Sequence, residues 1–336
     1  MQTPLVSICC ITYNHAPYIH QCLDGFVMQK TDFPIEVLIH DDASTDGTAD
    51  IIREYEQKYP ETFKPIYQTE NQYSKGIDPF RTYIFPRIQG KYMALCEGDD
   101  YWIDKKKLQK QVDFMEANND FSICFHPVKV YNQNKGKFIE NYTIPPNMPK
   151  ITDIKTLANG NFINTPSVLY RNNQEVFNEL NNFPNLVIGD YLFHMLFARH
   201  GKIVRLPQKM AVYRIHDQGI WSTKNAGYTY PIWLNLLKAL LANFDNDKEV
   251  SRILKEQYLR TASDLLDFYI TNNDFDSQEH LISQVENLLH ENSYFLFIKL
   301  INNLKDEICS IRKTWTYRLG RILLTPLRVI RYLRRA

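Results

Sequence analysis

The sequence predicts an α/β fold with a helical C-terminal part. Through the first hundred residues, short apolar runs alternate with segments of helical spacing, which is typical of βαβ units and a parallel sheet. Acid-rich polar stretches follow directly after several of these runs, where an α/β sheet presents its ligand-binding groups. At 336 residues, the chain can form one large domain with an accessory unit.

The alternation predicts each element of the first hundred residues in turn. We expect strands at 5–11, 35–39, 66–68 and 92–96, and helices at 18–28, 47–58 and 80–88. In the first of these helices, Ile19, Leu23 and Phe26 recur at the spacing of one helix face. Helices of this length between consecutive strands indicate that the strands run parallel.

The rest of the chain is less regular. A helix is predicted at 107–118 and a strand at 122–131, followed by an Asn- and Pro-rich loop at 132–149. After this loop we expect a strand at 162–170, a helix at 190–200, and strands at 203–206 and 211–213. Helices are expected at 233–241, 250–270 and 276–303. The predicted division is an α/β domain at 1–225, a helical region at 226–306 and a basic tail at 307–336.

Composition is that of an ordinary globular protein. The net charge of +1 gives no indication of a nucleic-acid partner. The six cysteines form no CxxC pair, so we interpret them as buried thiols of a reducing compartment. No secretory signal is visible at the start, and no apolar run reaches the roughly 18 residues that cross a bilayer. We therefore expect a soluble, cytoplasmic body.

The most informative stretch is Glu-Gly-Asp-Asp-Tyr-Trp at 97–102, directly after the apolar run at 92–96. Clustered carboxylates repel each other unless something neutralises their charge. A divalent cation that has oxygen ligands and carries substrate phosphates is the natural partner. A solvated acidic turn is the structural alternative.

Two loops at predicted strand ends also carry polar groups. Thr12, Tyr13 and Asn14 could hold a flat heterocycle, or form a turn with a packed ring. In the loop at 41–48, capping of the next helix accounts for the later polar residues, but not for Asp41 and Asp42. One of these two acids is therefore available to accept a hydrogen bond from a base.

Two later positions complete the set of candidates. Asp190 begins an apolar helix, where the helix dipole alone favours an acid. Alternatively, it is a general base that takes a proton from an attacking hydroxyl. His216 is either a packing residue or a ligand that completes a metal or phosphate site with Asp99. No Walker loop, GxGxxG or GxSxG is present in the sequence.

Taken together, these motifs resemble those of the family 2 glycosyltransferases of GT-A fold, a Rossmann-like mixed sheet flanked by helices. The resemblance covers roughly residues 4–222. It runs through Val-Ser-Ile-Cys-Cys-Ile-Thr-Tyr-Asn at 6–14, Gln29, Asp-Asp-Ala-Ser-Thr-Asp-Gly-Thr at 41–48, Glu-Gly-Asp-Asp at 97–100, Gly-Asp at 189–190 and Tyr-Arg-Ile-His at 213–216. Enzymes of this family transfer a sugar from a nucleotide-diphosphate donor to an acceptor hydroxyl, with inversion at the anomeric carbon.

The resemblance implies a donor site at the first strand ends. Thr12, Tyr13 and Asn14 would contact the donor's nucleotide, and Asp42 its base. Glu97 would lie near the ribose, at a position where the family more often has Asp. We expect a UDP-linked donor first.

The resemblance also implies a metal and a base. Asp99 matches the metal-binding acid of the DxD-type motif, and Asp100 would face the donor sugar or the acceptor. His216 would contact the metal or the diphosphate. The implied cofactor is Mg²⁺ or Mn²⁺, which braces the diphosphate. Asp190 matches the catalytic base, preceded by Gly189 where the family more often has Glu.

The tail is basic, with no acid after Glu307. On a helical wheel its apolar residues fall on one side and most of its arginines on the other, and Pro326 is expected to kink the helix. This pattern is typical of a helix that lies on an anionic membrane surface, the alternative being a helix packed on the protein. Similar tails occur in bacterial members of the family that act on lipid-carried glycans.

The sequence thus predicts an inverting, metal-dependent glycosyltransferase, peripheral on the cytoplasmic face of the inner membrane. We expect it to extend a lipid-linked glycan of the cell surface, such as capsule, lipopolysaccharide or exopolysaccharide. One alternative is a catalytically inactive nucleotide-sugar-binding scaffold at the membrane, against which the intact acids argue. The other is a sugar nucleotidyltransferase, but residues 12–15 lack the glycine-rich, basic loop usual for that chemistry.

Overall fold

The computed structural model describes residues 2–141, 143–183, 189–219 and 224–288. It divides the chain into a first unit, Met1–Tyr258, and a second unit, Leu259–Ala336. All of the site residues predicted from the sequence belong to the first unit. The predicted basic tail at 307–336 lies outside the described residues.

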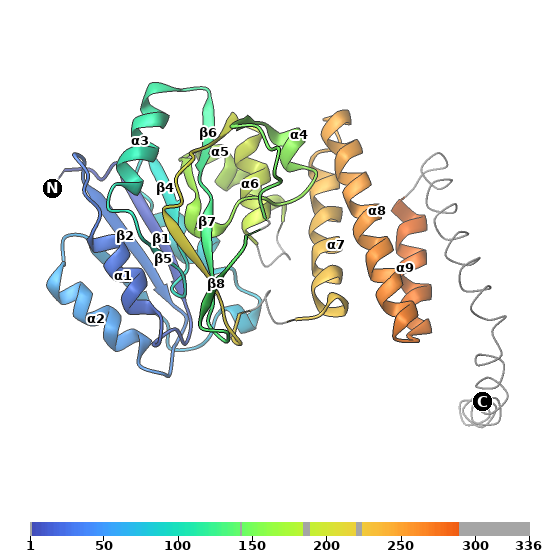
Figure 1. Cartoon of the computed structure of the whole chain (residues 1–336), viewed down its shortest axis with the longest axis horizontal. Helices are drawn as coiled ribbons and strands as arrows, with labels where there is room; N and C mark the ends of the chain where they lie inside the picture. The colour runs from blue at the N-terminus through green and yellow to red at the C-terminus, as the bar shows by residue number, and fades with distance from the viewer. Residues whose placement is uncertain (1, 142, 184–188, 220–223, 289–336) are drawn as a thin grey trace. The chain divides into compact units, whose positions relative to one another are not determined.

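A mixed eight-stranded sheet forms the centre of the first unit, in the order β3-β2-β1-β4-β10-β6-β11-β9. Its first half is parallel, as predicted, and consists of β1 (Val6–Thr12), β2 (Ile35–Asp41), β3 (Phe63–Tyr67) and β4 (Tyr92–Leu95). Helices α1 (Ile19–Val27) and α2 (Thr48–Lys58) lie beside β1 and β2 (Figure 1). Strands β1, β2 and β4 are buried along almost their whole length and are mostly apolar, as expected of strands covered on both faces, whereas the edge strand β3 is mostly half-buried.

The second half of the sheet mixes directions. Strand β10 (Leu169–Arg171) is antiparallel to both β4 and β6 (Phe121–Phe125). Strand β11 (Lys202–Arg205) is parallel to β6, and β9 (Ile151–Thr152) is antiparallel to β11. The strand direction therefore changes next to β4, the strand that leads to the acid cluster, Glu97, Asp99 and Asp100.

A second, four-stranded sheet has the order β5-β12-β7-β8. Its strands are β5 (Tyr101–Trp102), β12 (Ala211–Ile215), β7 (Val128–Asn132) and β8 (Lys137–Ile139). Strand β5 directly follows the acid cluster and pairs with β12. This pairing brings residues 97–102 beside residues 211–216, although more than a hundred residues separate the two segments.

Prolines explain three departures from the predicted elements. The predicted strand at 122–131 is β6 and β7, in different sheets, and Pro127 lies between them. The predicted helix at 80–88 is a π-helical turn, η2 (Phe80–Ile84), followed by a 3₁₀ turn, η3 (Phe85–Arg87), that contains Pro86. The predicted strand at 162–170 starts with a 3₁₀ turn, η4 (Thr165–Ser167), that contains Pro166. Proline has no N–H to donate, so it interrupts both helices and strand ladders.

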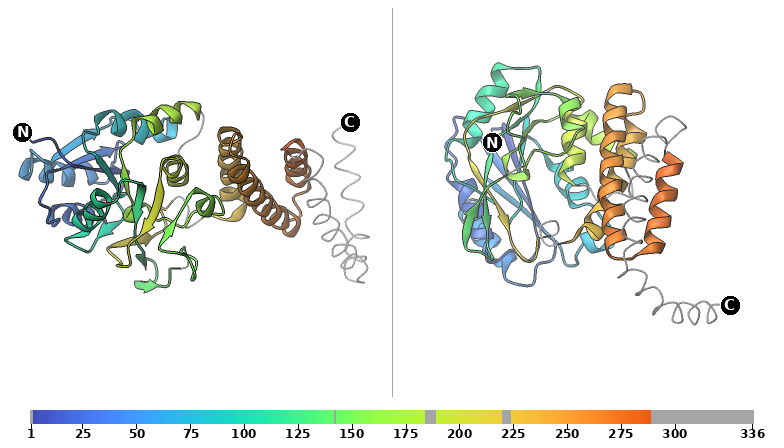
Figure 2. Two further views of the ribbon diagram at one scale, coloured as in Figure 1. Left: turned by 90° about the horizontal axis from the view of Figure 1, so that it is seen from above. Right: turned by 45° about the vertical axis from the view of Figure 1, so that its right-hand side comes forward.

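The predicted later helices are present as α3 (Lys107–Ala117), α6 (Asp190–Ala198), α7 (Ala226–Asn243), α8 (Lys248–Thr271) and α9 (Phe275–Leu288). The short helices α4 (Ile154–Leu157) and α5 (Gln174–Glu179) were not predicted, and residues 289–303 of the predicted helix at 276–303 lie outside the described residues. Helix α6 lies between the large sheet and α7 (Figure 2). The rings of Tyr191 on α6 and Trp233 on α7 stack with their centroids 4.8 Å apart. Among the helices described, none has both the length and the apolar composition to cross a membrane.

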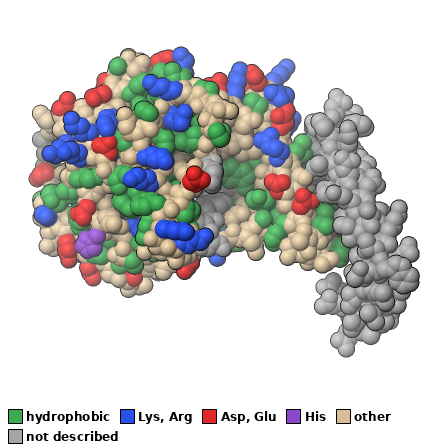
Figure 3. Space-filling view, viewed as in Figure 1, with side chains coloured by type: hydrophobic (Ala, Val, Ile, Leu, Met, Phe, Trp, Pro, Cys, Tyr) green, Lys and Arg blue, Asp and Glu red, His purple; other side chains and the backbone are tan. Residues whose placement is uncertain are grey.

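The surface charges are mixed, as the near-zero net charge suggests, and the described cysteines are buried. On the face shown in Figure 3, basic side chains are interspersed with acidic ones over the first unit. The prediction of buried thiols is confirmed for the cysteines that the structure describes, which are Cys9, Cys10, Cys22, Cys96 and Cys124, all free and buried. Cys309 lies outside the described residues.

Candidate active site

The loops that follow β1 and β2 are held together at the carboxyl ends of these strands. Asn14 has a left-handed backbone (φ 54°), a conformation that Asn tolerates better than most residues. Its N–H donates to Ser44 Oγ (2.8 Å), and its Oδ1 accepts from the N–H of Thr45 (2.9 Å). The N–H of His15 donates to Thr48 Oγ1 (2.8 Å). Asn14 is therefore engaged in joining the two loops.

The other residues predicted to bind the nucleotide lie around the same strand ends. Asp42 is buried, and its two oxygens accept from the N–H groups of Gln72 (2.7 Å) and Tyr73 (3.0 Å). Thr12 is buried, and its hydroxyl has no partner among the described residues. Tyr13 is 46% exposed, and it directly follows Thr12, whose carbonyl oxygen accepts from the N–H of Asp42 (3.0 Å).

The loop after β4 places Asp99 next to two histidines. Asp99 Oδ2 lies 2.9 Å from Nε2 of His216 and 4.0 Å from Nε2 of His15. One ligand atom from each of the three residues lies within 4.8 Å of the other two. Asp99 and His216 were predicted from the sequence, but His15 was not, although it directly follows the Thr-Tyr-Asn motif. Carboxylate and imidazole groups are established ligands of divalent metals, so this donor set fits a cation.

Gly98 lets this loop lie against β1. A Cβ atom at this position would lie 2.7 Å from Thr12 Oγ1 and 3.0 Å from His15 Nδ1. The N–H of Gly98 donates to the carbonyl oxygen of Ile11 (3.0 Å). Glycine is therefore required here because the backbone itself packs on the end of β1.

The acids of the cluster have different electrostatic environments. Burial raises the pKa of Glu97 to about 8, and the negative charges of Asp99 and Asp190 contribute. Burial also acts to raise the pKa of Asp99, but the hydrogen bond with His216 and the nearby His15 outweigh it and hold this pKa below its usual value.

The turn η4 connects Asp190 with the acid cluster. Thr165 Oγ1 donates to Asp190 Oδ2 (3.3 Å), and the carbonyl oxygen of Pro166 accepts from the indole N–H of Trp102 (2.9 Å). The charges of both parts act on Tyr213 on β12: burial raises the pKa of its hydroxyl, and the charges of Asp100, Glu97, Asp99 and Asp190 raise it further.

Asp100 faces the second sheet. Its side chain is 1% exposed, and its Oδ1 accepts from the N–H of Arg214 (2.8 Å). Burial and the neighbouring charge of Asp99 raise its pKa well above the usual range. One oxygen of Asp100 is thus engaged by the backbone of β12, while its Oδ2 is buried with no partner among the described residues; that Asp100 faces the donor sugar or the acceptor stays a prediction.

Arg214, which the sequence analysis did not single out, connects the cluster to the second sheet. Its Nε donates to the carbonyl oxygen of Asp99 (2.8 Å), and a terminal nitrogen donates to Gln133 Oε1 (2.7 Å). Its guanidinium lies over the rings of Tyr18 (4.8 Å) and Tyr101 (5.1 Å). A planar guanidinium carries several N–H donors in a fixed fork, so it can reach two separate acceptors while its face lies over aromatic rings; the single ammonium group of a lysine lacks this fork.

Trp102 and Lys107 fix the C-terminal side of the acid loop, which is the segment at 97–100 that carries the acid cluster. The indole N–H of Trp102 donates to the carbonyl oxygen of Pro166 (2.9 Å). Lys107 is fully buried, with its Nζ 4.1 Å from the centre of the Trp102 ring and 2.8 Å from Gln111 Oε1. Burial lowers the pKa of this amine to about 7.

Asp190 occupies the first turn of α6, and several side chains orient it. Its Oδ1 accepts from Asn161 Nδ2 (3.2 Å), and its Oδ2 accepts from Thr165 Oγ1 (3.3 Å). His194, one turn further along the helix, has its Nε2 3.7 Å from Asp190 Oδ2, while its Nδ1 lies 2.6 Å from the hydroxyl of Tyr170. Burial acts to raise the pKa of Asp190, but the contact with His194 outweighs it and holds the pKa below its usual value.

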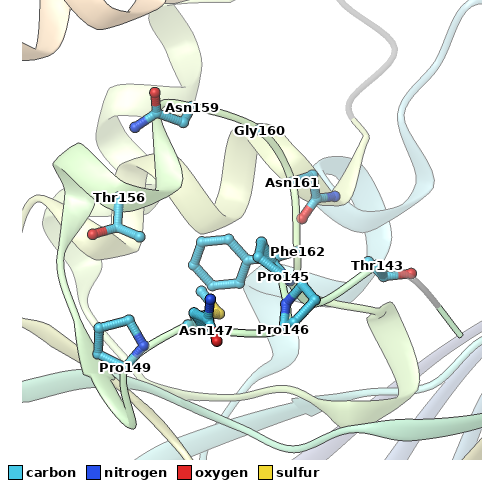
Figure 4. Close-up of a pocket in the computed structure, with 11 residues that line it drawn as sticks. Thr143, Pro145, Pro146, Asn147, Pro149, Thr156, Asn159, Gly160, Asn161 and Phe162 are labelled. Atoms are coloured by element: carbon cyan, nitrogen blue, oxygen red, sulfur yellow. The ribbon is translucent and has the colours of Figure 1, made fainter.

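A pocket of about 480 Å³ lies beside Asn161, the residue that donates to Asp190. It is lined by residues of two segments, 143–149 and 156–162. The ring of Phe162 lies between these segments, and the amide side chains of Asn159 and Asn161 lie at the edge (Figure 4). The pocket therefore combines apolar rings with amide groups.

The chain belongs to glycosyl transferase family 2, because the sequence profile of this family matches residues 7–176, just over half of the chain. An uncharacterized protein of Mycobacterium tuberculosis is 42% identical over 217 residues, which are 64% of this chain and 60% of that protein. The Escherichia coli UDP-Glc:alpha-D-GlcNAc-diphosphoundecaprenol beta-1,3-glucosyltransferase WfaP is 34% identical over 117 residues, or 35% of this chain and 43% of WfaP. The matched part of the chain thus spans less than two thirds of these relatives.

Solved structures show the same fold. The structure of residues 1–349 of S. aureus TarS in complex with UDP-GlcNAc superposes with a TM-score of 0.55 at 17% identity, over 85% of this chain and 93% of that one. Mannosyltransferase PcManGT from Pyrobaculum calidifontis, in complex with GDP-Man and Mn²⁺, gives a TM-score of 0.52 at 15% identity, over 97% of this chain and 85% of that one. The predictions of the family and of the GT-A fold are confirmed.

Proposed function

We propose that this protein transfers a sugar from a nucleotide-diphosphate donor to a hydroxyl group of a glycan acceptor, with inversion at the anomeric carbon. The observation that carries this proposal is geometric: Asp99 contacts His216 at 2.9 Å, and the turn η4 links Asp190 to the loop that carries Asp99, through Thr165 on one side and Pro166 on the other. A charge-neutralising site for a leaving diphosphate and an ionised base then lie next to each other, as an in-line displacement requires.

The donor would lie across the ends of β1, β2 and β4. The exposed ring of Tyr13 offers a stacking surface for the nucleotide base, and the Asp42 carboxylate can accept from it with lone pairs that its two backbone contacts leave. Glu97 would face the ribose. A UDP-linked sugar remains the donor we expect first, and the names of TarS and WfaP refer to complexes or reactions with UDP-sugars.

Asp99 and His216 would hold a divalent cation, Mg²⁺ or Mn²⁺, together with the donor's diphosphate. When bound, the cation neutralises the negative charge of the leaving group. The residues of the chain fit this task, because Asp99 Oδ1 is buried with no partner among the described residues and the pKa of Asp99 is held low. Arg214 fixes the backbone of Asp99 and so sets the direction of its carboxylate.

Asp190 would act as the general base. Its low pKa keeps it ionised at neutral pH, and Asn161 and Thr165 fix its orientation. The acceptor's hydroxyl proton moves to the Asp190 carboxylate while the hydroxyl oxygen bonds to the anomeric carbon. The bond from that carbon to the diphosphate oxygen breaks on the opposite face, which inverts the configuration.

We further propose that the acceptor is a lipid-linked glycan and that the enzyme works at the cytoplasmic face of the inner membrane. The pocket beside Asn161 offers the mixture of rings and amides that suits a saccharide. The name of WfaP specifies a diphosphoundecaprenol-linked acceptor for that enzyme. The basic tail predicted at 307–336 would attract an anionic surface, and the test of this point is vesicle binding with and without the tail.

The proposed function is tested by screening nucleotide sugars for thermal stabilisation in the presence of Mn²⁺ or Mg²⁺, followed by transfer assays with the donors that bind. A ligand that binds only the folded state raises its melting temperature. We expect stabilisation by at least one donor, loss of it in Asp99→Asn, and nucleoside diphosphate release on addition of an acceptor. Binding without any release or transfer would favour the scaffold, and pyrophosphate release from a nucleoside triphosphate would favour the nucleotidyltransferase.

A further inference from the structure

His15 lies at the acid cluster without an evident structural task for its ring. Its side chain is 16% exposed, and its Nδ1 is buried without a partner among the described residues. Its Nε2 lies 4.0 Å from Asp99 Oδ2, which is too far for a hydrogen bond. The rings of His15 and His216 meet edge to face at 6.1 Å, and the Nε2 atoms of both approach the same oxygen, Asp99 Oδ2.

The three side chains are held in place by groups outside the cluster. The backbone of His15 is fixed by Thr48, and the ring of His216 packs at 4.7 Å on Tyr18. The carbonyl of Asp99 is held by the guanidinium of Arg214. Such rigid support is what positions the ligands of a metal site.

The separations suit a common metal ion. Ligand atoms that each lie roughly 2.0–2.2 Å from one ion are at most about 4.4 Å apart. The ligand atoms of His15, Asp99 and His216 lie within 4.8 Å of one another, so a small rotation of a side chain closes the site. Three protein ligands would leave further coordination positions of the ion for diphosphate oxygens and water.

We propose that His15 is a third protein ligand of the cation and that the set of His15, Asp99 and His216 selects a first-row transition ion, such as Mn²⁺, over Mg²⁺. Mg²⁺ favours oxygen ligands and keeps several waters, whereas imidazole nitrogens bind transition ions well. This inference rests on the proposed function, because the cation is the one that would hold the donor's diphosphate. The competing explanation is that His15 only adjusts the charge of Asp99 from a distance.

The test is Mn²⁺ binding followed by electron paramagnetic resonance, on the full chain with UDP present. The variants are His15→Ala, His15→Gln and Asp99→Asn, and the matched control is His20→Ala, which removes an exposed imidazole from the same segment. Circular dichroism and melting curves establish that each variant folds. Electron spin-echo modulation then counts the nitrogens bound to Mn²⁺, which a purely structural role of His15 would not change.

We expect two bound nitrogens in the wild type and in His20→Ala, but one in both His15 variants, together with at least tenfold weaker Mn²⁺ binding. A hundredfold excess of Mg²⁺ should leave most of the Mn²⁺ bound in the wild type and displace it in His15→Ala. Unchanged modulation and affinity in folded His15 variants would overturn the inference while leaving the proposed function intact. If Mn²⁺ bound nowhere in the wild type and transfer still proceeded with chelator, both the third ligand and the metal role would be wrong, but sugar transfer would stand.

Discussion

His216 Nε2 lies 2.9 Å from Asp99 Oδ2, although 117 residues separate the two in the sequence. The contact depends on the pairing of β5 with β12, which aligns Ala211 with Trp102 and Val212 with Tyr101. The acid loop and the end of β12 are thereby fixed to each other. The site is thus formed where the two sheets of the first unit meet, and residues that hold this junction should matter as much as the acids.

Asp190→Asn should abolish transfer while leaving donor binding largely unchanged. The amide keeps the shape of the side chain but cannot take a proton, and a general base contributes about 10²–10⁴-fold to the rate. Turnover number and donor dissociation constant are measured separately, by product release and calorimetry. Asp153→Asn, which alters an acid at the start of α4 outside the site, is the control and should keep full activity. Wild-type turnover in Asp190→Asn would refute the assignment of the base.

Arg214→Lys should weaken both folding and activity. In Arg214, different nitrogens of the guanidinium reach the carbonyl oxygen of Asp99 and Gln133 Oε1; the single ammonium group of a lysine cannot span both, so a buried acceptor loses its partner. We expect a loss of about 2–4 kcal/mol in the free energy of unfolding, measured by urea denaturation. Arg53→Lys, on the exposed surface of α2, should change the stability by less than about 0.5 kcal/mol. Equal effects of the two changes would show that Arg214 has no special role.

Lys107→Met should alter how stability depends on pH. Burial lowers the pKa of Lys107 from 10.5 to about 7, so between these values the unfolded chain binds more protons than the folded one. The free energy of unfolding of the wild type therefore rises with pH across this window. The cost of burying the Lys107 amine is largest at low pH. Relative to Lys107→Met, the wild type should gain about 2 kcal/mol between roughly pH 7 and pH 9.

The measurement is urea denaturation of both proteins at several pH values, with Lys106→Met as the matched control. Lys106 is exposed at the start of the same helix, so its replacement should leave the pH dependence as in the wild type. A constant difference between the wild type and Lys107→Met at every pH would mean that the buried amine does not titrate in this range.

Gly98→Ala should destabilise the protein and impair metal binding. The added methyl would lie 2.7 Å from Thr12 Oγ1, so the acid loop has to move away from β1. Overpacking of this kind costs about 1–3 kcal/mol, seen as a lower melting temperature. Gly189→Ala is the control, because none of the residues that the structure describes would lie within 4 Å of its added methyl. Similar melting temperatures for wild type and Gly98→Ala would show that this loop is not tightly packed.

The parallel half of the sheet could be predicted from the sequence because its signals are local. The apolar run of β1 and the acids after β4 each lie within one continuous segment. The interruptions by Pro86, Pro127 and Pro166 were also visible, but the apolar residues around them dominated the pattern. At these positions the prolines, and not the hydrophobic pattern, determine the local structure.

The junction of the two sheets could not be predicted in the same way. Arg214 reaches Asp99 only through the pairing of β12 with β5, and no local pattern specifies which strands pair. His15 is adjacent to a predicted motif, but its approach to Asp99 depends on how the loops after β1 and β4 meet. The roles of residues that act through long-range contacts could therefore not be predicted from the sequence.

The central claim is that Asp99 and its histidine partners hold a cation that binds an activated sugar's diphosphate. Isothermal titration calorimetry of UDP-, GDP- and dTDP-linked sugars, with Mn²⁺ or Mg²⁺ and with chelator, tests it most directly. We predict that at least one donor binds the wild type in the presence of metal, and that chelator weakens this binding at least tenfold. Asp99→Asn should bind the same donor equally weakly with metal and with chelator. Absence of heat for every donor with either metal, in a folded wild-type protein, would contradict the claim.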